Sequence, residues 1–276
     1  FFFKQKTAYE IVSRDWSSDV CSSDLIGVYA RSNRISSLVV GVSGGIDSAV
    51  VSTLCARTRI PTLAVVMPIH QAPELHSRSL AHCAWLWEQF DCVSQSIVNL
   101  TAVFDAMRAL EPANYLAGYD VTQEDLAWAN TRSRLRMTTL YQIAQCHHGI
   151  VVGTGNRVED FGVGFFTKYG DGGVDISPIG SITKTGVWKL GGELGILPEI
   201  INAAPTDGLW DDGRCDQDQL SGLTYAELER AMVLDECGVP RHVMDDEDQV
   251  LLTQYLQIRN RNLHKMLPIP VFRPTE

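Results

Sequence analysis

The sequence predicts an α/β protein: a doubly wound, mostly parallel sheet that is flanked by helices. The first observation is that short β-branched apolar runs alternate along the chain with longer helical segments. Strands that are separated by helices favour parallel pairing through crossover connections. The second observation is a glycine-rich loop behind the first strand, at the edge where such sheets bind their ligands.

The expected elements follow in chain order. Residues 38–42, 62–67 and 150–153 are apolar runs typical of strands buried on both faces, and 93–98 is expected as a further strand. Helices are expected at residues 49–57, 73–89, 102–110, 124–146, 183–194, 225–234 and 246–262. Thr122 is expected to cap the 124–146 helix, with Asp125 close to a capping-box position.

Composition excludes several classes of partner. The 276 residues include 23 Lys and Arg against 33 Asp and Glu, a formal net charge of −10. Attraction to nucleic acid or to an anionic membrane needs a basic surface, so neither is expected as a partner. No apolar run approaches the roughly 20 residues of a membrane helix. The seven cysteines show no paired spacing, which indicates a reducing, cytoplasmic environment.

Residues 1–25 are expected to be a non-native, disordered leader. They have neither helical nor alternating periodicity, and they lack the pattern of a signal peptide. Residues 4–11 and 15–25 resemble the translation of sequencing-adapter DNA. Residues 26–276 are expected to form a single domain.

A glycine-rich turn, Ser-Gly-Gly-Ile-Asp-Ser, covers residues 43–48 and predicts a phosphate-binding loop. Adjacent glycines let backbone N–H groups face an anion, and the following helix adds its positive N-terminal end. The turn is neither a Walker A sequence nor a dinucleotide-binding Gly-x-Gly-x-x-Gly loop. Asp47 would repel a phosphate alone, so its presence favours a bound Mg²⁺. The alternative is a simple glycine turn with an aspartate helix cap.

A second loop, after the strand at 150–153, carries further charged residues. Glu159 is a carboxylate that could share a metal with Asp47, and Lys168 is a cation for an anionic substrate. An ordinary glycine-rich turn is the alternative interpretation.

Three arginines occupy the 124–146 helix. Arg132 and Arg136 share one helix face, whereas Arg134 points elsewhere, so at most some of them meet one ligand. A solvated helix face is the alternative interpretation.

These motifs resemble a known family. The turn at 43–48 is similar to the pyrophosphate-binding loop of the N-type ATP pyrophosphatases, which leave AMP on a substrate. The string Phe-Thr-Lys-Tyr-Gly-Asp-Gly-Gly at 166–173 narrows the resemblance to the ammonia-dependent NAD⁺ synthetases. Other segments that resemble this family are 130–137, 205–209 and 264–265. The segment 211–222 departs from the more acidic pattern of relatives and is expected to close over the site.

The resemblance implies an adenine nucleotide alpha-hydrolase-like fold and the ATP-dependent amidation of deamido-NAD⁺ to NAD⁺ with ammonia. The reaction passes through an acyl adenylate and releases AMP and pyrophosphate. Mg²⁺ is the implied cofactor, and the implied assembly is a homodimer.

The resemblance also implies roles for individual residues. ATP would be bound by Gly41, Val42, Ser43, Gly44, Gly45, Ile46, Asp47, Ser48, Thr154, Lys184 and Thr206. The implied catalytic residues are Asp47, Lys184 and Thr206, and the implied Mg²⁺ ligands are Asp47 and Glu159. Deamido-NAD⁺ would be bound by Arg134, Lys168, Asp175, His264 and Lys265.

Two other functions stay open. Another N-type ATP pyrophosphatase ligase, such as a tRNA-thiolating enzyme, would share the loop, although the acidic balance argues against binding RNA. A non-catalytic adenine-nucleotide-binding module would not need Asp47, Glu159 and Lys184 together. A separate glutaminase that supplies the ammonia also stays open.

Overall fold

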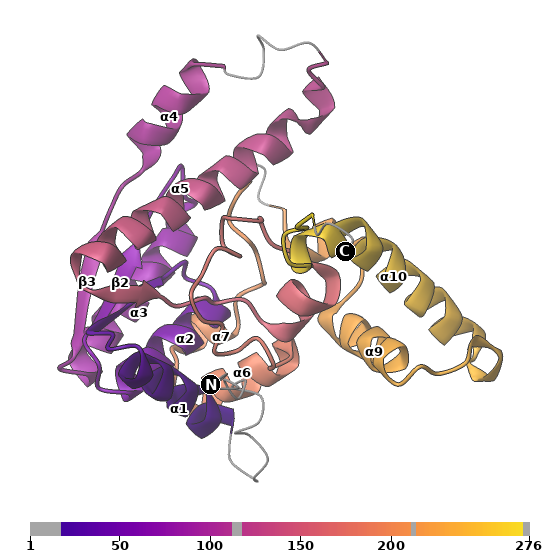
Figure 1. The fold of residues 1–276 in the computed structure, drawn as a ribbon, viewed down its shortest axis with the longest axis horizontal. Coiled ribbons are helices and arrows are strands. Elements are labelled where there is room, and N and C mark those ends of the chain that lie inside the picture. The colour runs from indigo at the N-terminus through magenta and orange to yellow at the C-terminus, as the bar shows by residue number, and fades with distance from the viewer. Residues whose placement is uncertain (1–17, 112–117, 211–213, 273–276) are drawn as a thin grey trace.

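The computed structural model describes residues 18–111, 118–210 and 214–272, and a four-stranded parallel sheet lies within it (Figure 1). The strand order is β3-β2-β1-β4. The strands are β1 (Ser37–Gly41), β2 (Thr62–Val66), β3 (Val93–Ile97) and β4 (Gly149–Val151).

Strand addition reverses at β1. The chain moves outward from β1 to β2 and β3 and then returns to place β4 on the other side of β1. Val39 of β1 therefore pairs with Leu63 of β2 and also with Val151 of β4, in parallel register. Such a reversal is a topological switch point, where open α/β sheets bind ligands at the carboxyl ends of their strands. The predicted doubly wound parallel sheet is confirmed.

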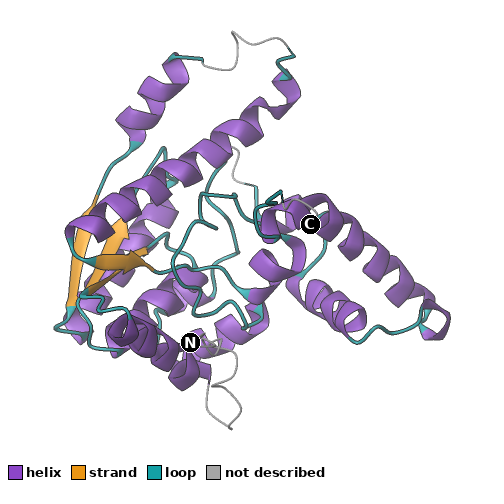
Figure 2. Cartoon of the chain, in the orientation of Figure 1, coloured by secondary structure: helices purple, strands orange, loops and turns teal. Residues whose placement is uncertain are grey.

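Helices surround this small sheet (Figure 2). They are α1 (Ser18–Ser32), α2 (Ile46–Arg57), α3 (Pro73–Gln89), α4 (Thr101–Ala109), α5 (Glu124–Cys146), α6 (Lys184–Glu193), α7 (Pro198–Ile201), α8 (Asp216–Gln219), α9 (Tyr225–Glu236) and α10 (Asp246–Met266). Arg157–Val163 forms a π-helical turn, and Val121–Gln123 and Arg241–Val243 form 3₁₀ turns. Among the described residues, no helix has the length and apolar composition needed to span a bilayer.

Successive side chains of β1 pack into hydrophobic clusters on opposite faces of the sheet. Leu38 and Val40 pack into the cluster formed with α2 and α6. Val39 packs into the opposite cluster, with Phe104 of α4 and Ala144 of α5. Successive side chains of a strand point to opposite faces. Both faces are buried, which is why the strand is a continuous apolar run.

Helices α9 and α10 pack against each other on the side of the molecule away from the sheet (Figure 1). Leu228 of α9 and Tyr255 of α10 share a buried cluster with Val158 of the π-helical turn. Asn262 Nδ2 donates to the backbone oxygen of Val163 at 2.9 Å. The helix pair therefore anchors the π-helical turn.

The main helices agree with the sequence predictions, and the predicted cap is wrong. Helix α5 has the predicted bounds, but Thr122 does not cap it. Asp120 caps the 3₁₀ turn Val121–Gln123 that comes directly before the helix. Asp120 Oδ1 accepts from the N–H of Thr122 at 2.9 Å and from its hydroxyl at 2.7 Å. A 3₁₀ turn then leads into α5. The π-helical turn, α7 and α8 occupy segments for which the sequence predicts only loops, because elements of four to seven residues carry no periodic signal.

The predicted disorder of residues 1–25 is wrong for its last part. Residues 18–25 belong to helix α1, and residues 1–17 lie outside the described residues. Ile26 and Ala30 are buried in the core, and helix propagation beyond such a packed turn costs little. Ser22 Oγ also donates to the backbone oxygen of Pro178 at 3.0 Å. The non-native origin of residues 1–25 stays a prediction.

Leu228→Ala tests the packing of the α9–α10 pair. Leu228 is fully buried, so we expect the free energy of unfolding to fall by about 2–5 kcal/mol, from lost transfer energy and a cavity. Val233→Ala is the control on the same helix, because Val233 is 58% exposed and its loss should change stability by about 0.5 kcal/mol or less. Urea unfolding measures both. Equal effects of the two substitutions would contradict the packing.

Candidate active site

The loop between β1 and α2 presents backbone N–H groups to a cavity. Gly44 has a φ of 90°, and a Cβ at this position would collide with the backbone oxygen of Leu75, so only glycine fits. Ser43 Oγ accepts from the N–H of Gly45 at 3.2 Å and lies 3.0 Å from Ser48 Oγ, which fixes the turn. Helix α2 begins without a side-chain hydrogen bond at its cap within the described chain. Its first N–H groups can therefore meet an anion.

A buried lysine joins two carboxylates behind this loop. Lys184, the first residue of α6, places Nζ 2.5 Å from Asp47 Oδ2 and 2.9 Å from Glu159 Oε1. The lysine side chain is only 4% exposed. A lone buried ammonium would be strongly disfavoured, and the two carboxylates compensate for the lost water. Asp47 does not act as the helix cap of the alternative interpretation, since Gly45 holds that position.

Burial and charge oppose each other in this cluster. Burial alone would lower the pKa of Lys184, but the charges of Asp47 and Glu159 outweigh it and raise that pKa. Burial raises the pKa of Asp47 in spite of the ammonium. Burial acts in the same sense on Glu159, but Lys184 and the Tyr225 hydroxyl outweigh it and hold the pKa of Glu159 below its usual value. Lys184 therefore remains a cation.

Asn156 links the segment that carries Glu159 to the Asp47 carboxylate. This fully buried side chain accepts from the N–H groups of Val158 at 3.0 Å and Glu159 at 3.1 Å, and so caps the π-helical turn. Its Nδ2 donates to Asp47 Oδ1 at 3.2 Å. The sequence predictions omit Asn156. The available signal was an asparagine directly before an acidic first turn, a common capping pattern.

Tyr225 and Asp216 extend the cluster, and neither was predicted as a site residue. The Tyr225 hydroxyl oxygen lies 2.5 Å from Glu159 Oε1 and 3.0 Å from Asp216 Oδ2. Asp216 and Tyr225 are both buried, and Asp216 lines the cavity. Residues 211–222 were expected to close over the site. Helix α8, which lies within this segment, contributes Asp216 to the cavity wall. Residues 211–213 lie outside the described residues.

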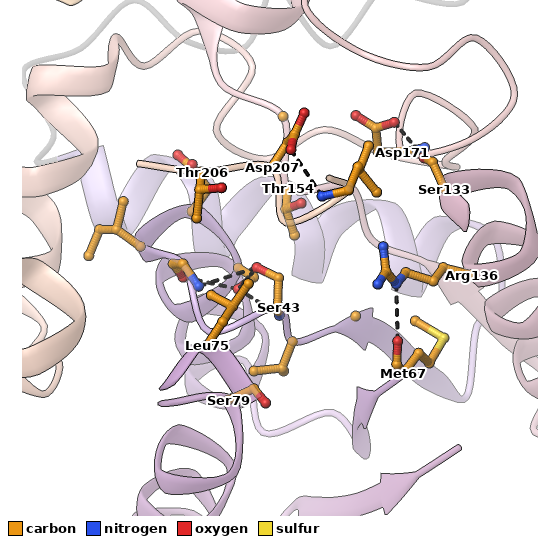
Figure 3. Close-up of a pocket in the computed structure, with 18 of the residues that line it drawn as sticks. Ser43, Met67, Leu75, Ser79, Ser133, Arg136, Thr154, Asp171, Thr206 and Asp207 are labelled. Atoms are coloured by element: carbon orange, nitrogen blue, oxygen red, sulfur yellow. Dashed lines mark hydrogen bonds between the residues drawn. The ribbon is translucent and has the colours of Figure 1, made fainter. Parts of the chain in front are cut away.

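Figure 3 shows part of the lining of a cavity of about 250 Å³. The three residues of the lysine–carboxylate cluster line it as well. Thr154 and Thr206, both predicted to contact ATP, line it. The other predicted site residues that line it are Gly41, Val42, Ser43, Gly45, Ile46, Asp47, Ser48, Glu159 and Lys184. Gly44 supports the turn from behind, against α3. The residues predicted to bind ATP thus gather at the switch point of the sheet.

The three arginines of α5 separate as their spacing predicts. Arg136 lines the cavity, and its Nε donates to the backbone oxygen of Met67 at 3.0 Å (Figure 3). Arg132 is buried and donates from Nη1 to the backbone oxygen of Leu209 at 2.5 Å. Arg134 is exposed, on another face. Arg136 is a cavity residue to which the sequence predictions give no role.

The five residues predicted to bind deamido-NAD⁺ lie outside this cavity. Within the described chain, the lining residues do not include Arg134, Lys168, Asp175, His264 or Lys265. Four of them gather where the 166–173 loop meets the end of α10.

Two hydrogen bonds and one more contact define that meeting point. Lys168 Nζ donates to the backbone oxygen of His264 at 3.2 Å, and Lys265 Nζ donates to that of Phe166 at 2.8 Å. Arg134 Nε lies 3.4 Å from the backbone oxygen of Lys168.

Asp175 lies apart from these four residues. Its carboxylate accepts from the N–H of Val151 at 2.7 Å and from the Tyr141 hydroxyl at 3.2 Å. These contacts place Asp175 beside β4 rather than with the cationic group.

A glycine turn at a helix start, a buried lysine between carboxylates, and a cavity at a switch point define a nucleotide-using enzyme of the adenine nucleotide alpha-hydrolase-like fold. Residues 20–267 match the family model described as NAD synthase. The chain belongs to the NAD synthase family.

Individual relatives support this family membership. The NH(3)-dependent NAD(+) synthetase of Carboxydothermus hydrogenoformans is 40% identical over 211 residues, which cover 75% of this chain and 80% of the relative. The enzyme of the same name from Methanosarcina mazei is 33% identical over 245 residues, 86% of this chain and 90% of the relative.

Solved structures of similar proteins share the fold. An NMN synthetase from Francisella tularensis superposes with a TM-score of 0.77 at 28% identity, over 93% of this chain and 99% of its own. An NAD+ synthetase from Burkholderia pseudomallei gives a TM-score of 0.67 at 28% identity, over 94% and 95%.

Lys184→Met tests the buried cluster. The substitution keeps an unbranched side chain but leaves Asp47 and Glu159 without their cation, so the free energy of unfolding should fall by about 3–5 kcal/mol. Lys189→Met on the same helix is the control. That side chain is 81% exposed, so its loss should cost less than about 1 kcal/mol. Similar urea-unfolding midpoints for the two variants would mean that the cluster does not stabilise the fold.

Proposed function

We propose that this chain is a carbon–nitrogen ligase that uses ATP and ammonia to convert deamido-NAD⁺ into NAD⁺. The observation that carries the proposal is the buried Lys184–Asp47–Glu159 cluster beside the phosphate loop, in a member of the NAD synthase family. A cation and two carboxylates beside a helix N-terminus suit the handling of phosphate and metal.

The chemistry needs an activated carboxylate, because direct amidation would expel oxide. An oxygen of the nicotinate carboxylate attacks the α-phosphorus of ATP, and the bond to the bridging oxygen of the β-phosphate breaks. Pyrophosphate leaves with that electron pair, and an acyl adenylate remains. Ammonia then attacks the acyl carbon and loses a proton, and AMP leaves. The first step depends on holding two anions, the carboxylate and ATP, in line, and the second on holding ammonia against the acyl carbon. Charge stabilisation helps most at the phosphates.

The β1–α2 loop is assigned to the phosphates of ATP. Its glycine turn and the start of α2 offer N–H donors, and the helix dipole favours negative charge. Thr154 and Thr206 line the same cavity and are assigned as further ATP contacts. Lys184 is assigned to the charge of the leaving pyrophosphate.

Asp47 and Glu159 are assigned as Mg²⁺ ligands, and their donor chemistry fits. Mg²⁺ binds through one or two carboxylates together with substrate phosphates and water. Two carboxylates leave the remaining coordination positions to substrate phosphates and water. When bound, Mg²⁺ supplies charge neutralisation at the phosphates.

The acceptor site is assigned to the cationic group at the end of α10, with Asp175. Arg134, Lys168 and Lys265 supply positive charge for a dinucleotide phosphate, on a chain that is otherwise acidic, and His264 lies beside them. These residues lie outside the ATP cavity. An acceptor bound to them would extend from the end of α10 and place its carboxylate in the cavity.

A homodimer is part of the proposal. Helix α4 and the residue that caps its C-terminus expose Val103 by 52%, Met107 by 39% and Leu110 by 67%. Their spacing places them on one helix face, which a second copy could cover. The six cysteines from Cys55 to Cys237 are all free, which supports a cytoplasmic location.

One alternative acceptor has an observation in its favour. The Francisella tularensis structure with a TM-score of 0.77 is an NMN synthetase, so nicotinate mononucleotide is a second candidate substrate. It carries the same carboxylate, and the activation step would be unchanged.

The deciding assay supplies the chain with ATP, Mg²⁺, one acceptor and either ammonium or glutamine. We expect NAD⁺ and pyrophosphate in equal amounts from deamido-NAD⁺ with ammonium, and almost none with glutamine. Amide formed faster from nicotinate mononucleotide would move the assignment to that acceptor. Asp47→Asn is the control, because it should lose pyrophosphate release far more than ATP binding. Equal loss of both would favour a nucleotide-binding module without turnover.

A further inference from the structure

Asp216 is a buried carboxyl group with no role in the chemistry described so far. It starts helix α8, is 4% exposed and lines the ATP cavity. Its Oδ2 lies 3.0 Å from the Tyr225 hydroxyl oxygen, and its buried Oδ1 has no hydrogen-bond partner among the residues that the structure describes. An unpartnered buried oxygen is costly when it carries negative charge, so Asp216 requires an explanation.

The number of protons available to the Tyr225–Asp216–Glu159 group explains how Asp216 can be buried. Tyr225 carries a single hydroxyl proton but lies within hydrogen-bond distance of two carboxyl oxygens, Glu159 Oε1 at 2.5 Å and Asp216 Oδ2 at 3.0 Å. Glu159 Oε1 also accepts from the Lys184 ammonium at 2.9 Å, which favours its ionised form. Tyr225 therefore donates to Glu159, and the proton of the second hydrogen bond belongs to Asp216.

We propose that Asp216 is a positioning residue: as a neutral carboxyl group it donates to Tyr225, and through Tyr225 it holds the Glu159 carboxylate in place for Mg²⁺. The inference rests on the proposed function, because it takes Glu159 as a metal ligand. It assigns to α8, a segment far from Glu159 in the sequence, control over the geometry of the metal site.

The surroundings agree with this arrangement. Burial, followed by the negative charge of Glu159, raises the pKa of Asp216 to about 7. The Tyr225 ring is held edge-on by Trp188, with ring centroids 5.7 Å apart, so its hydroxyl has little freedom to move. The remaining freedom is rotation of the O–H, and the Asp216 donor fixes the direction in which that hydrogen points.

The test compares Asp216→Ala, Asp216→Asn and Tyr225→Phe. Calorimetry of the full chain with a non-hydrolysable ATP analogue at several Mg²⁺ concentrations gives the apparent Mg²⁺ affinity without an acceptor. Asp216→Ala and Tyr225→Phe should each weaken that affinity by about tenfold, as expected for one lost hydrogen bond to a charged group. Asp216→Asn should restore it, because its amide can still donate to Tyr225. Asp235→Asn, at an exposed position of α9, the helix that carries Tyr225, is the control and should leave the affinity unchanged.

A double-mutant cycle separates positioning from simple packing. If Asp216 acts through Tyr225, then Asp216→Ala should have no further effect on Mg²⁺ affinity in the Tyr225→Phe background. Additive losses would overturn the inference, as would an Asp216→Asn variant as impaired as Asp216→Ala. Failure of the proposed function has a different signature, since Mg²⁺-dependent analogue binding would be normal while no amide forms.

Discussion

The contact of Lys184 with Asp47 and Glu159 is the constraint on which the rest of the site depends. It joins three segments that are distant in the sequence: the start of α2, the π-helical turn and the start of α6. Each segment begins a helix, so three positive helix ends converge near two buried carboxylates. An isolated charge could not be buried here, and the cluster is stable only when all three segments are in place.

The fold supplies that convergence through its strand order. Placing β4 beside β1 brings the loops that follow both strands to the same edge, the glycine turn from one and the π-helical turn from the other. Asn156 then links the two loops directly through Asp47. Helices α9 and α10 support the π-helical turn from outside, and through Tyr225 they reach Glu159 itself. Core packing and the active site therefore share the same side chains.

The sequence allowed prediction of the parts whose signal is local. Buried strands and the long helices α3 and α5 have periodic patterns, and the glycine turn has a backbone requirement at Gly44 that no other residue meets. Asn156, Asp216 and Tyr225 were not predicted as site residues, because their roles depend on contacts across 9 to 109 residues of sequence. Asp47 and Glu159 were predicted as a pair, but nothing local indicated that Lys184 would lie between them.

The most direct measurement is a crystal structure of the chain with Mg²⁺ and a non-hydrolysable ATP analogue. We expect phosphates on the N–H groups at the start of α2, with Mg²⁺ bonded to phosphate oxygens and to the carboxylates of Asp47 and Glu159. A nucleotide bound elsewhere, with Asp47 and Glu159 still contacting only their present protein partners, would show that this cluster is not the ATP and metal site.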